Sequence, residues 1–284
     1  MSRVVIVTGA GRGIGRAHAL AFGASGARVV VNDLSAEVAG EVAAMIGPTA
    51  IVNTDDVGTW SGAQRLVSSA VEAFGGLDVL VNNAGIVRDR MVVGCGEDEW
   101  DEVVRVHLKG HFATLHHAAA HWRAVAKAGG AVSGRVINTS SGAGLFGSVG
   151  QANYSAAKAG IASLTLVAAA ELARYGVTVN AIAPAARTRM TEATFADVMA
   201  APAEGFDAMS PENVSPLVVW LGSEEAGDVT GRMFEVDGGR VCVVHGWQRG
   251  PEIDKGARWS PDELGVVVRK LVADDHPTPV YGAE

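Results

Sequence analysis

Three residues, Ser141, Tyr154 and Lys158, have the side chains and spacing needed to interconvert an alcohol and a ketone. Tyr154 and Lys158 are four residues apart, so on a helix they share one face, where the ammonium would favour the phenolate. A free tyrosine titrates near pH ~10, so a base useful near neutrality needs a much lower pKa. The Ser141 hydroxyl could donate to a substrate oxygen while the phenol gives or takes a proton. Such a pair also arises by chance on helix surfaces, so it needs support from the rest of the chain.

A glycine-rich turn near the N-terminus has the pattern of a dinucleotide site. A β-branched run at 3–7 is followed by Gly9, Gly13 and Gly15, spaced as Gly-x-x-x-Gly-x-Gly, and an Ala-rich stretch at 14–24 predicts a helix. At such a strand-to-helix turn, backbone N–H groups and the helix dipole can hold a pyrophosphate, and the missing Cβ atoms let phosphates approach. A glycine turn alone is weak evidence, because many are only tight connections.

The choice between NAD and NADP depends on two charged residues near this turn. Asp33 follows a second predicted strand at 28–32, where a carboxylate accepts hydrogen bonds from ribose hydroxyls and repels a 2′-phosphate. Arg12, within the loop, favours NADP because a guanidinium could pair with that phosphate. Asp33 weighs more because it occupies the ribose position directly, so we expect NAD. The simpler role for Asp33 is a helix cap or turn residue.

These motifs make the chain, over about residues 3 to 240, resemble the single-domain branch of the short-chain dehydrogenase/reductase family. The resemblance implies an α/β fold of the Rossmann type, a doubly wound parallel sheet with helices on both faces. It also implies that Ser141, Tyr154 and Lys158 are catalytic. By the same resemblance, the cofactor contacts are Gly9, Arg12, Gly13, Ile14, Gly15, Asp33, Asp56, Val57, Asn83, Ala84, Gly85, Tyr154, Lys158, Pro184 and Thr188.

The chain departs from the family pattern at two places. His107 stands in a Val-His-Leu run where the family has an asparagine on a water-linked proton path. Imidazole can relay a proton, since its ordinary pKa is ~6.5, but a helix histidine bonded to a carbonyl is an equal alternative. Pro184 is followed by Ala185 where the family has glycine, and the next segment is one residue short, which makes Thr188 the expected carboxamide contact.

Finer features resemble one subgroup of the family. The run 31–34, the Val-His-Leu run and the extension after Gly239 are similar to the dehydrogenase portion of the multifunctional enzyme of peroxisomal β-oxidation. That similarity implies NAD-dependent oxidation of a 3-hydroxyacyl-CoA or a hydroxysteroid. An NADPH-dependent 3-oxoacyl thioester reductase is the first alternative. The second, a non-catalytic NAD-responsive binding protein, would not need serine, tyrosine and lysine together.

Length and periodicity predict one catalytic domain with an extension. The 284 residues are 48% hydrophobic, and strand and helix patterns alternate, which favours a parallel sheet with helices on both faces. We expect about seven strands, near 3–7, 28–32, 50–53, 78–82, 134–140, 177–182 and 232–236. The catalytic domain should span 1–240, and the extension 241–284 should pack on it or on a neighbouring subunit.

The segment 185–210 has no clear period, and its position after a strand predicts a loop that contacts the substrate. Its apolar wall would comprise Met190, Phe195, Met199, Phe206 and Met209. Two cations, Arg187 and Arg189, could meet CoA phosphates, although exposed surface charges are the favoured reading.

Composition also argues against several classes of protein. The formal net charge is −8 and there is no basic stripe, which disfavours nucleic-acid binding. Cys95 and Cys242 are too few for a disulfide framework and fit a reducing cytoplasm. No apolar run reaches the ~18 residues of a membrane span.

Histidines 107, 111, 117 and 121 form two i,i+4 pairs, but without a further placed ligand we expect no catalytic metal. The family resemblance implies a homodimer or homotetramer.

Overall fold

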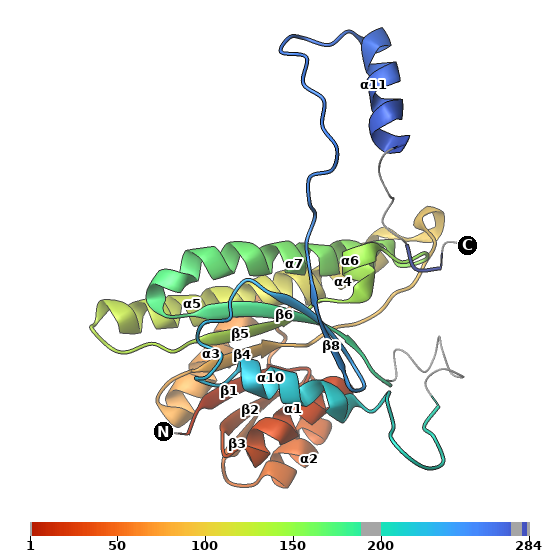
Figure 1. Ribbon diagram of the computed structural model, residues 1–284. Helices are drawn as coiled ribbons and strands as arrows, with labels where there is room; N and C mark the ends of the chain where they lie inside the picture. Colours follow the sequence, from red (N-terminus) through yellow and green to blue (C-terminus); the bar gives the residue numbers. More distant parts are fainter. Residues whose placement is uncertain (1, 189–199, 274–279, 283–284) are drawn as a thin grey trace.

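The central feature of the protein is one eight-stranded sheet with strand order β3-β2-β1-β4-β5-β6-β7-β8. The computed structural model describes residues 2–188, 200–273 and 280–282. Neighbouring strands are parallel from β3 to β7, and only the β7–β8 pair is antiparallel. The architecture is therefore the doubly wound α/β fold that the sequence predicted (Figure 1).

All seven predicted strands form, and each begins within one residue of its expected position, although the strand expected at 177–182 extends to Ala185. The strands are short and most of their residues are buried, as in strands covered on both faces, whereas the strand at 50–53, at the sheet edge, is more exposed. Their bounds are β1 (Val4–Thr8), β2 (Arg28–Asn32), β3 (Ala50–Asn53), β4 (Val79–Asn82), β5 (Arg135–Thr139), β6 (Thr178–Ala185) and β7 (Met233–Asp237).

The eighth strand, β8 (Arg240–Val244), was not predicted. It folds back on β7 through a turn in which Gly238 has a φ of +47°, a value that favours glycine. The side chains of β8 are mostly exposed, although its sequence has an apolar run at 241–244 like those of the buried strands. The sheet therefore continues past residue 240, where the sequence placed the end of the catalytic domain.

Helices cover both faces of the sheet (Figure 1). One layer packs α1, α2 and α10 together, and the other brings α3, α5 and α7 against the sheet. The α-helices are α1 (Gly13–Ala24), α2 (Ala36–Ile46), α3 (Trp60–Phe74), α4 (Glu97–Val104), α5 (Gly110–Lys127), α6 (Gly142–Phe146), α7 (Ala152–Leu172), α10 (Ser215–Leu221) and α11 (Pro261–Ala273). Shorter turns are η1 (Val92–Gly94), η2 (Arg105–Lys109), η3 (Ala173–Tyr175) and η4 (Pro211–Val214).

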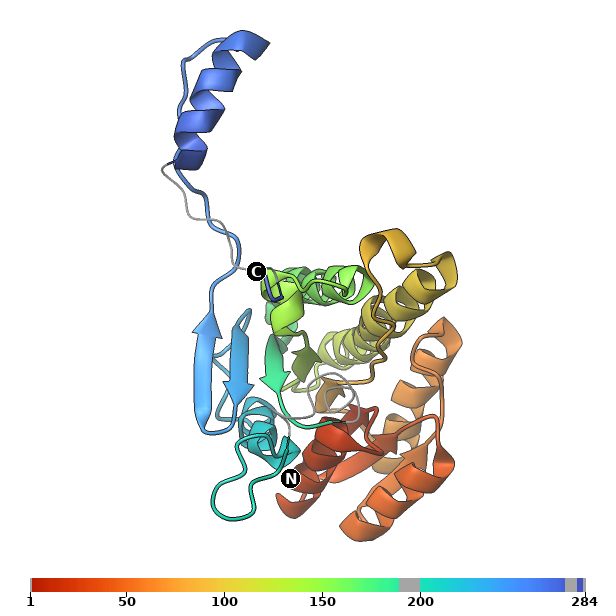
Figure 2. The same cartoon turned by 90° about the vertical axis from the view of Figure 1, so that its right-hand side faces the viewer.

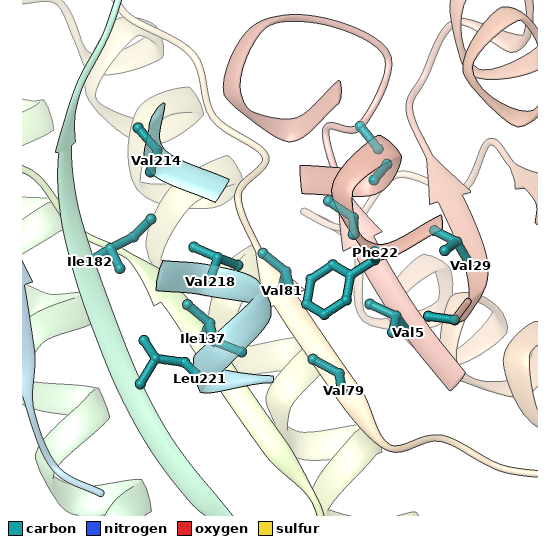
Figure 3. Packing of buried hydrophobic residues seen from close by; sticks show 14 of the residues in the cluster. Val5, Phe22, Val29, Val79, Val81, Ile137, Ile182, Val214, Val218 and Leu221 are labelled. Atoms are coloured by element: carbon teal, nitrogen blue, oxygen red, sulfur yellow. The ribbon is translucent and has the colours of Figure 1, made fainter. Parts of the chain in front are cut away.

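Alternation along the strands divides the core into two clusters. In β1, Val5 and Val7 face the α1 layer, whereas Val4 and Ile6 face the α3 layer. Figure 3 shows the first cluster, in which Phe22 of α1 lies among side chains of the central strands and of α10. The two-sided burial holds the carboxyl ends of the strands in fixed positions.

The strand order reverses between β1 and β4, which makes this edge of the sheet the switch point. In open α/β sheets, ligands bind in the crevice beyond the carboxyl ends of the strands at such a point. The glycine turn follows β1 and residues 83–85 follow β4. The fold therefore brings the two predicted cofactor motifs to one place.

The extension leaves the body of the molecule and then returns. After β8, the chain runs outward to α11, which projects away from the sheet and its helices (Figures 1 and 2). Within the described part of the chain, α11 buries none of its side chains. Residues 280–282 lie back on the body, where Tyr281 forms a parallel bridge with Ser148.

One helix is long and apolar enough to cross a membrane when judged by length and composition alone, Ala152–Tyr175. The core helix of a globular protein can pass the same test. This one packs against β6 and α6 within the fold, with Ile161 fully buried. About a third of its most apolar stretch, 33%, is buried inside the fold.

Candidate active site

Ser141, Tyr154 and Lys158 come together beyond the end of β5. Tyr154 and Lys158 lie in the first two turns of α7, and Ser141 caps α6 by accepting a hydrogen bond from the Ala143 N–H at 3.2 Å. The two helices approach closely, since a Cβ on Gly144 would lie 2.5 Å from the Cβ of Lys158. The Ser141 side chain favours ionisation of the Tyr154 phenol, and the Lys158 Nζ lies 5.5 Å from the Tyr154 ring centroid. The fold thus brings the predicted trio together.

Lys158 is buried at 2% exposure, and its Nζ donates to the Thr139 carbonyl at 2.6 Å. Burial lowers the pKa of Lys158 from 10.5 to about 7. A lysine with this pKa is only partly charged near neutrality. It therefore attracts negative charge on the phenol less strongly than the sequence pattern alone suggests.

The pKa of Tyr154 is raised above 10.0, mainly because burial disfavours the phenolate. The hydrogen bond from Ser141 works in the opposite direction, and the carboxylate of Asp89 adds to the increase. In the chain alone, burial outweighs the influence of Ser141 on the pKa of Tyr154. Further positive charge, as a nicotinamide cation would supply, is therefore needed to favour the phenolate.

His107 occupies a π-helical turn, η2, and its ring meets the ring of Tyr154 edge-on at a centroid distance of 5.2 Å. Its Nε2 lies 3.0 Å from the Ile86 N–H nitrogen and 2.7 Å from the Ile86 carbonyl oxygen. Among the described residues, the buried Nδ1 has no hydrogen-bond partner. Both expected roles retain support, because the ring is bonded to the backbone and also contacts the tyrosine.

The pKa of His107 lies well below 6.5, first because the ring is buried and next because Lys158 is nearby. The ordinary imidazole pKa, on which the relay hypothesis was based, therefore does not apply. His107 is neutral at physiological pH. Any proton it passes must use a neutral ring with one nitrogen donating and the other accepting.

Gly85 makes room for the His107 ring. A Cβ at residue 85 would lie 2.3 Å from Cε1 of His107. We therefore predict that Gly85→Ala costs about 1–3 kcal/mol of unfolding free energy, as overpacked sites do. Denaturant unfolding measures it, and Gly76→Ala, whose Cβ would meet nothing within 4 Å, is the control. If His107→Asn fails to relieve the loss in a double-mutant cycle, the contact with His107 is not its cause.

The glycine turn is built to leave open N–H groups at the start of α1. The N-cap residue of α1, Arg12, makes no side-chain cap bond and is exposed. Gly9 and Gly13 have φ values of +62° and +52°, and a Cβ on Gly15 would lie 2.2 Å from the Gly9 carbonyl oxygen. Such an uncapped helix terminus fits a pyrophosphate. Thr188 adjoins this turn, because its Cγ2 lies 3.4 Å from where a Gly13 Cβ would be.

Thr8 and Asn83 lock the β1 and β4 loops together. The Thr8 hydroxyl accepts hydrogen bonds from the N–H groups of Asn83 at 2.9 Å and Ala84 at 3.0 Å. In return, the Asn83 amide donates to the carbonyls of Thr8 at 3.0 Å and Gly9 at 3.3 Å. The Asn83 side chain thus positions the cofactor turn from behind.

Asp33 lies directly after β2, beside the glycine turn. Its Oδ2 accepts from the Gly11 N–H at 3.0 Å and its Oδ1 from the Ser35 N–H at 3.1 Å. A carboxylate oxygen can accept more than one hydrogen bond, so both oxygens retain capacity for ribose hydroxyls. The turn role and the ribose role are therefore compatible.

The predicted adenine contacts have a partner that the sequence did not reveal. Asp56 forms an ion pair with Arg105 at 2.7 Å and accepts from the Gly58 N–H at 2.8 Å. Val57, at 7% exposure, lies beneath Gly110. Arg105 begins η2, so this pair links the adenine side of the crevice to the turn that carries His107. Forty-nine residues separate Asp56 from Arg105, and no local pattern connects them.

The segment 185–210 is described only at its two ends. Pro184 is at the carboxyl end of β6, and the Arg187 N–H donates to the Met209 carbonyl. Arg187 forms a partly buried ion pair with Asp207, so it is not a free surface charge. Phe206 is 67% exposed. Arg189, Met190, Phe195 and Met199 lie outside the described residues.

Among the described residues, no three His, Cys, Asp or Glu side chains converge to hold a metal ion. The histidines of α5 have other surroundings. His111 is buried and its Nε2 lies 3.4 Å from the Thr139 backbone nitrogen, while His117 packs edge-on against Trp60. Cys95 and Cys242 are both free thiols.

Known proteins resemble this chain over nearly its whole length. Residues 3–198 match the family model described as short chain dehydrogenase. Hydroxyacyl-CoA dehydrogenase ChsB1 of Mycobacterium tuberculosis is 44% identical over 99% of this chain and 92% of that protein. Peroxisomal multifunctional enzyme type 2 of Mus musculus is 40% identical over 94% of this chain but only 34% of that protein. A crystal structure of a short chain dehydrogenase from Mycobacterium avium is 63% identical, with a TM-score of 0.91, over 99% of this chain and 98% of the other.

Proposed function

This chain belongs to the short-chain dehydrogenase/reductase family, and we propose that within it the chain is an NAD-dependent 3-hydroxyacyl-CoA dehydrogenase. The family places it among oxidoreductases that act on CH–OH groups with a nicotinamide cofactor. The observation that carries the proposal is the grouping of Ser141, Tyr154 and buried Lys158 beyond the end of β5, together with the uncapped glycine turn at the start of α1. The name of the relative from Mycobacterium tuberculosis, a hydroxyacyl-CoA dehydrogenase, supports the acyl-CoA substrate.

The three side chains have distinct roles in the proposed oxidation. Ser141 holds the substrate oxygen, and Tyr154 accepts its proton as the carbonyl forms. Bound nicotinamide supplies the hydride acceptor and a positive charge near the phenol. Lys158, held by the Thr139 carbonyl, adds the charge of its protonated fraction and can hold ribose hydroxyls. A buried tyrosine and a buried lysine thus work together only when a cationic ring lies beside them.

We propose that His107 provides the next step for the proton. Its ring contacts Tyr154, and its Nε2 can donate to or accept from the backbone of Ile86. A water molecule held by Nδ1, which has no partner among the described residues, could accept the proton from Tyr154 and pass it on to further water. The neutral ring would hold that water in place without taking up the proton itself.

We predict that Asp33 sets the preference for NAD. The wild type should use NAD with a higher kcat/KM than NADP, because the carboxylate accepts from ribose hydroxyls and repels a 2′-phosphate. Asp33→Ala should reduce the NAD:NADP ratio of kcat/KM by about 10-fold or more. Initial-rate kinetics with both cofactors measure this ratio, and Asp98→Ala, at an exposed position of α4, is the control. An unchanged ratio would remove Asp33 from cofactor selection.

The substrate class is tested by a panel of secondary alcohols with NAD. We expect 3-hydroxyacyl thioesters to be oxidised with higher kcat/KM than hydroxysteroids that lack a thioester. Comparing kcat/KM for an acyl-CoA and for the matching acyl-N-acetylcysteamine, which lacks the nucleotide, measures what the nucleotide part of CoA contributes. NADPH-dependent reduction of 3-oxoacyl thioesters, with little oxidation by NAD, would favour the reductase alternative.

We propose a homodimer or homotetramer built on the α5 and α7 faces. Exposed apolar side chains lie on both helices, with Phe112 on α5 and Leu166 and Val167 on α7. Burying them in a symmetric contact would remove this apolar surface from water. Sedimentation velocity measures the assembly.

The two free thiols support a reducing compartment such as the cytoplasm.

A further inference from the structure

The end of the extension is attached to the active-site region by backbone pairing. Tyr281 and Ser148 form a parallel bridge. The Val149 N–H donates to the Tyr281 carbonyl at 2.9 Å, and the Tyr281 N–H donates to the Gly147 carbonyl at 3.2 Å. These residues are far apart in the sequence, so the contact is a tertiary one. It joins the terminal segment to the loop between α6 and α7.

Side chains on both sides strengthen this attachment. The Tyr281 ring meets the Phe146 ring edge-on, with centroids 5.8 Å apart. A Cβ on Gly282 would lie 3.6 Å from the Val149 Cβ, and one on Gly147 would lie 3.5 Å from Val280 Cγ1. Aromatic contacts of this geometry contribute to stability beyond the area they bury. The segment 280–282 therefore occupies a defined place.

That place is next to the serine proposed to hold the substrate oxygen. A Cβ on Gly142 would lie 2.8 Å from Cε2 and 3.0 Å from the hydroxyl oxygen of Tyr281. Gly142 directly follows Ser141 and is the first residue of α6. Tyr281 is 47% exposed, so part of its surface is available to a ligand. Burial nevertheless raises the pKa of its phenol, which stays neutral near pH 7.

We propose that Tyr281 is a specificity-determining residue whose ring forms an apolar wall of the substrate site beside Ser141, within the same subunit. The wall would contact the alkyl chain that extends from the carbinol carbon, away from the thioester. It would therefore favour substrates in which this chain is long. The ring supplies the contact, and the hydroxyl is not needed. This inference rests on the proposed function, since it assigns a selective role at the same site.

The position of the segment can be tested without activity. In a Cys95→Ser/Cys242→Ser background, Val149→Cys with Gly282→Cys places two thiols at a Cβ separation suited to a disulfide. Mild oxidation should give a bond within one chain, seen by non-reducing electrophoresis and peptide mapping. A covalent dimer would show that the segment reaches another subunit, and would overturn the proposal.

Gly282 has a φ of +74°, so a cysteine at this position is strained and the disulfide variant could be disturbed. Hydrogen exchange tests the position of the segment without that substitution. In the wild type, the Val149 amide should exchange slowly. In a chain that ends at residue 279, it should exchange quickly. Fast exchange in both proteins would also overturn the proposal.

Kinetics test the selective role. Tyr281→Ala should lower kcat/KM about tenfold for a long-chain 3-hydroxyacyl thioester and little for a four-carbon one, mostly through KM. Tyr281→Phe should behave as the wild type, and the KM for NAD should not change. Trp247→Ala, at a 91% exposed position of the same extension, is the matched control. Equal losses for both chain lengths would refute the selective role, whereas a wild type inactive on all such thioesters would refute the proposed function instead.

Discussion

Replacing Tyr154 by Phe should lower kcat by about 10²–10⁴-fold while leaving dinucleotide binding intact, because the change removes only the phenolic oxygen. The Ser141 side chain favours the ionised form of that oxygen, which is the one proposed to accept the substrate proton. The ring itself would remain packed against His107, so the fold of α7 should not change. Steady-state kinetics give kcat, and quenching of tryptophan fluorescence gives the Kd of the dinucleotide.

The pH profile makes this prediction more specific. Burial raises the pKa of Tyr154, so the phenolate is scarce near neutrality and the wild-type oxidation rate should increase with pH. The residual activity of Tyr154→Phe should lack that dependence. Tyr175→Phe, in η3 at the far end of α7, controls for the loss of a phenol elsewhere. Retention of more than about a tenth of kcat in the Tyr154 variant would contradict its role as acid and base.

Replacing Lys158 by Met should lower kcat by about 10²-fold or more, since a buried cation that stabilises developing charge has no substitute at this position. It should also change how stability depends on pH. In the cofactor-free wild type, burial lowers the pKa of Lys158 to about 7, against 10.5 in the unfolded chain. Between these values the unfolded chain binds the extra proton, so the free energy of unfolding increases with pH.

The contribution of Lys158 to this increase is at most about 1.4 kcal/mol per pH unit, and it begins near pH 7. Below pH 7 both states are protonated, and the cost of burying the charge is fully present. Lys158→Met should remove the slope between pH 7.5 and 9.5, as measured by denaturant unfolding. Lys127→Met, at the exposed end of α5, should keep it. If the increase in unfolding free energy with pH persists in the Lys158 variant, other titrating groups cause it.

The local patterns were sufficient for the main architecture. β1 and β2 are short β-branched runs that are buried on both faces, and such runs are recognisable because their consecutive central residues are apolar. The glycine turn could be predicted for a similar reason, since φ values of +62° and +52° at Gly9 and Gly13 leave few other residue types. The apolar run at 241–244 in β8 gives the same signal, but it follows residue 240, where the resemblance to the family ends, and it was not predicted as a strand.

The candidate site was only partly predictable. Tyr154 and Lys158 are one helical turn apart, so their common face follows from the sequence. Their electrostatics do not, because the pKa values depend on how deeply the whole fold buries them. The same holds for His107, whose pKa is lowered by burial rather than set by its own chemistry.

The sequence by itself determined which chemical groups are present and which neighbours along one strand, turn or helix they must have. Only the tertiary structure decided the contacts between distant segments: Arg105 with Asp56, Thr8 with Asn83, and Tyr281 beside Gly142. The physical reason is that periodicity and backbone conformation act over a few residues, whereas desolvation and side-chain contacts depend on everything packed nearby.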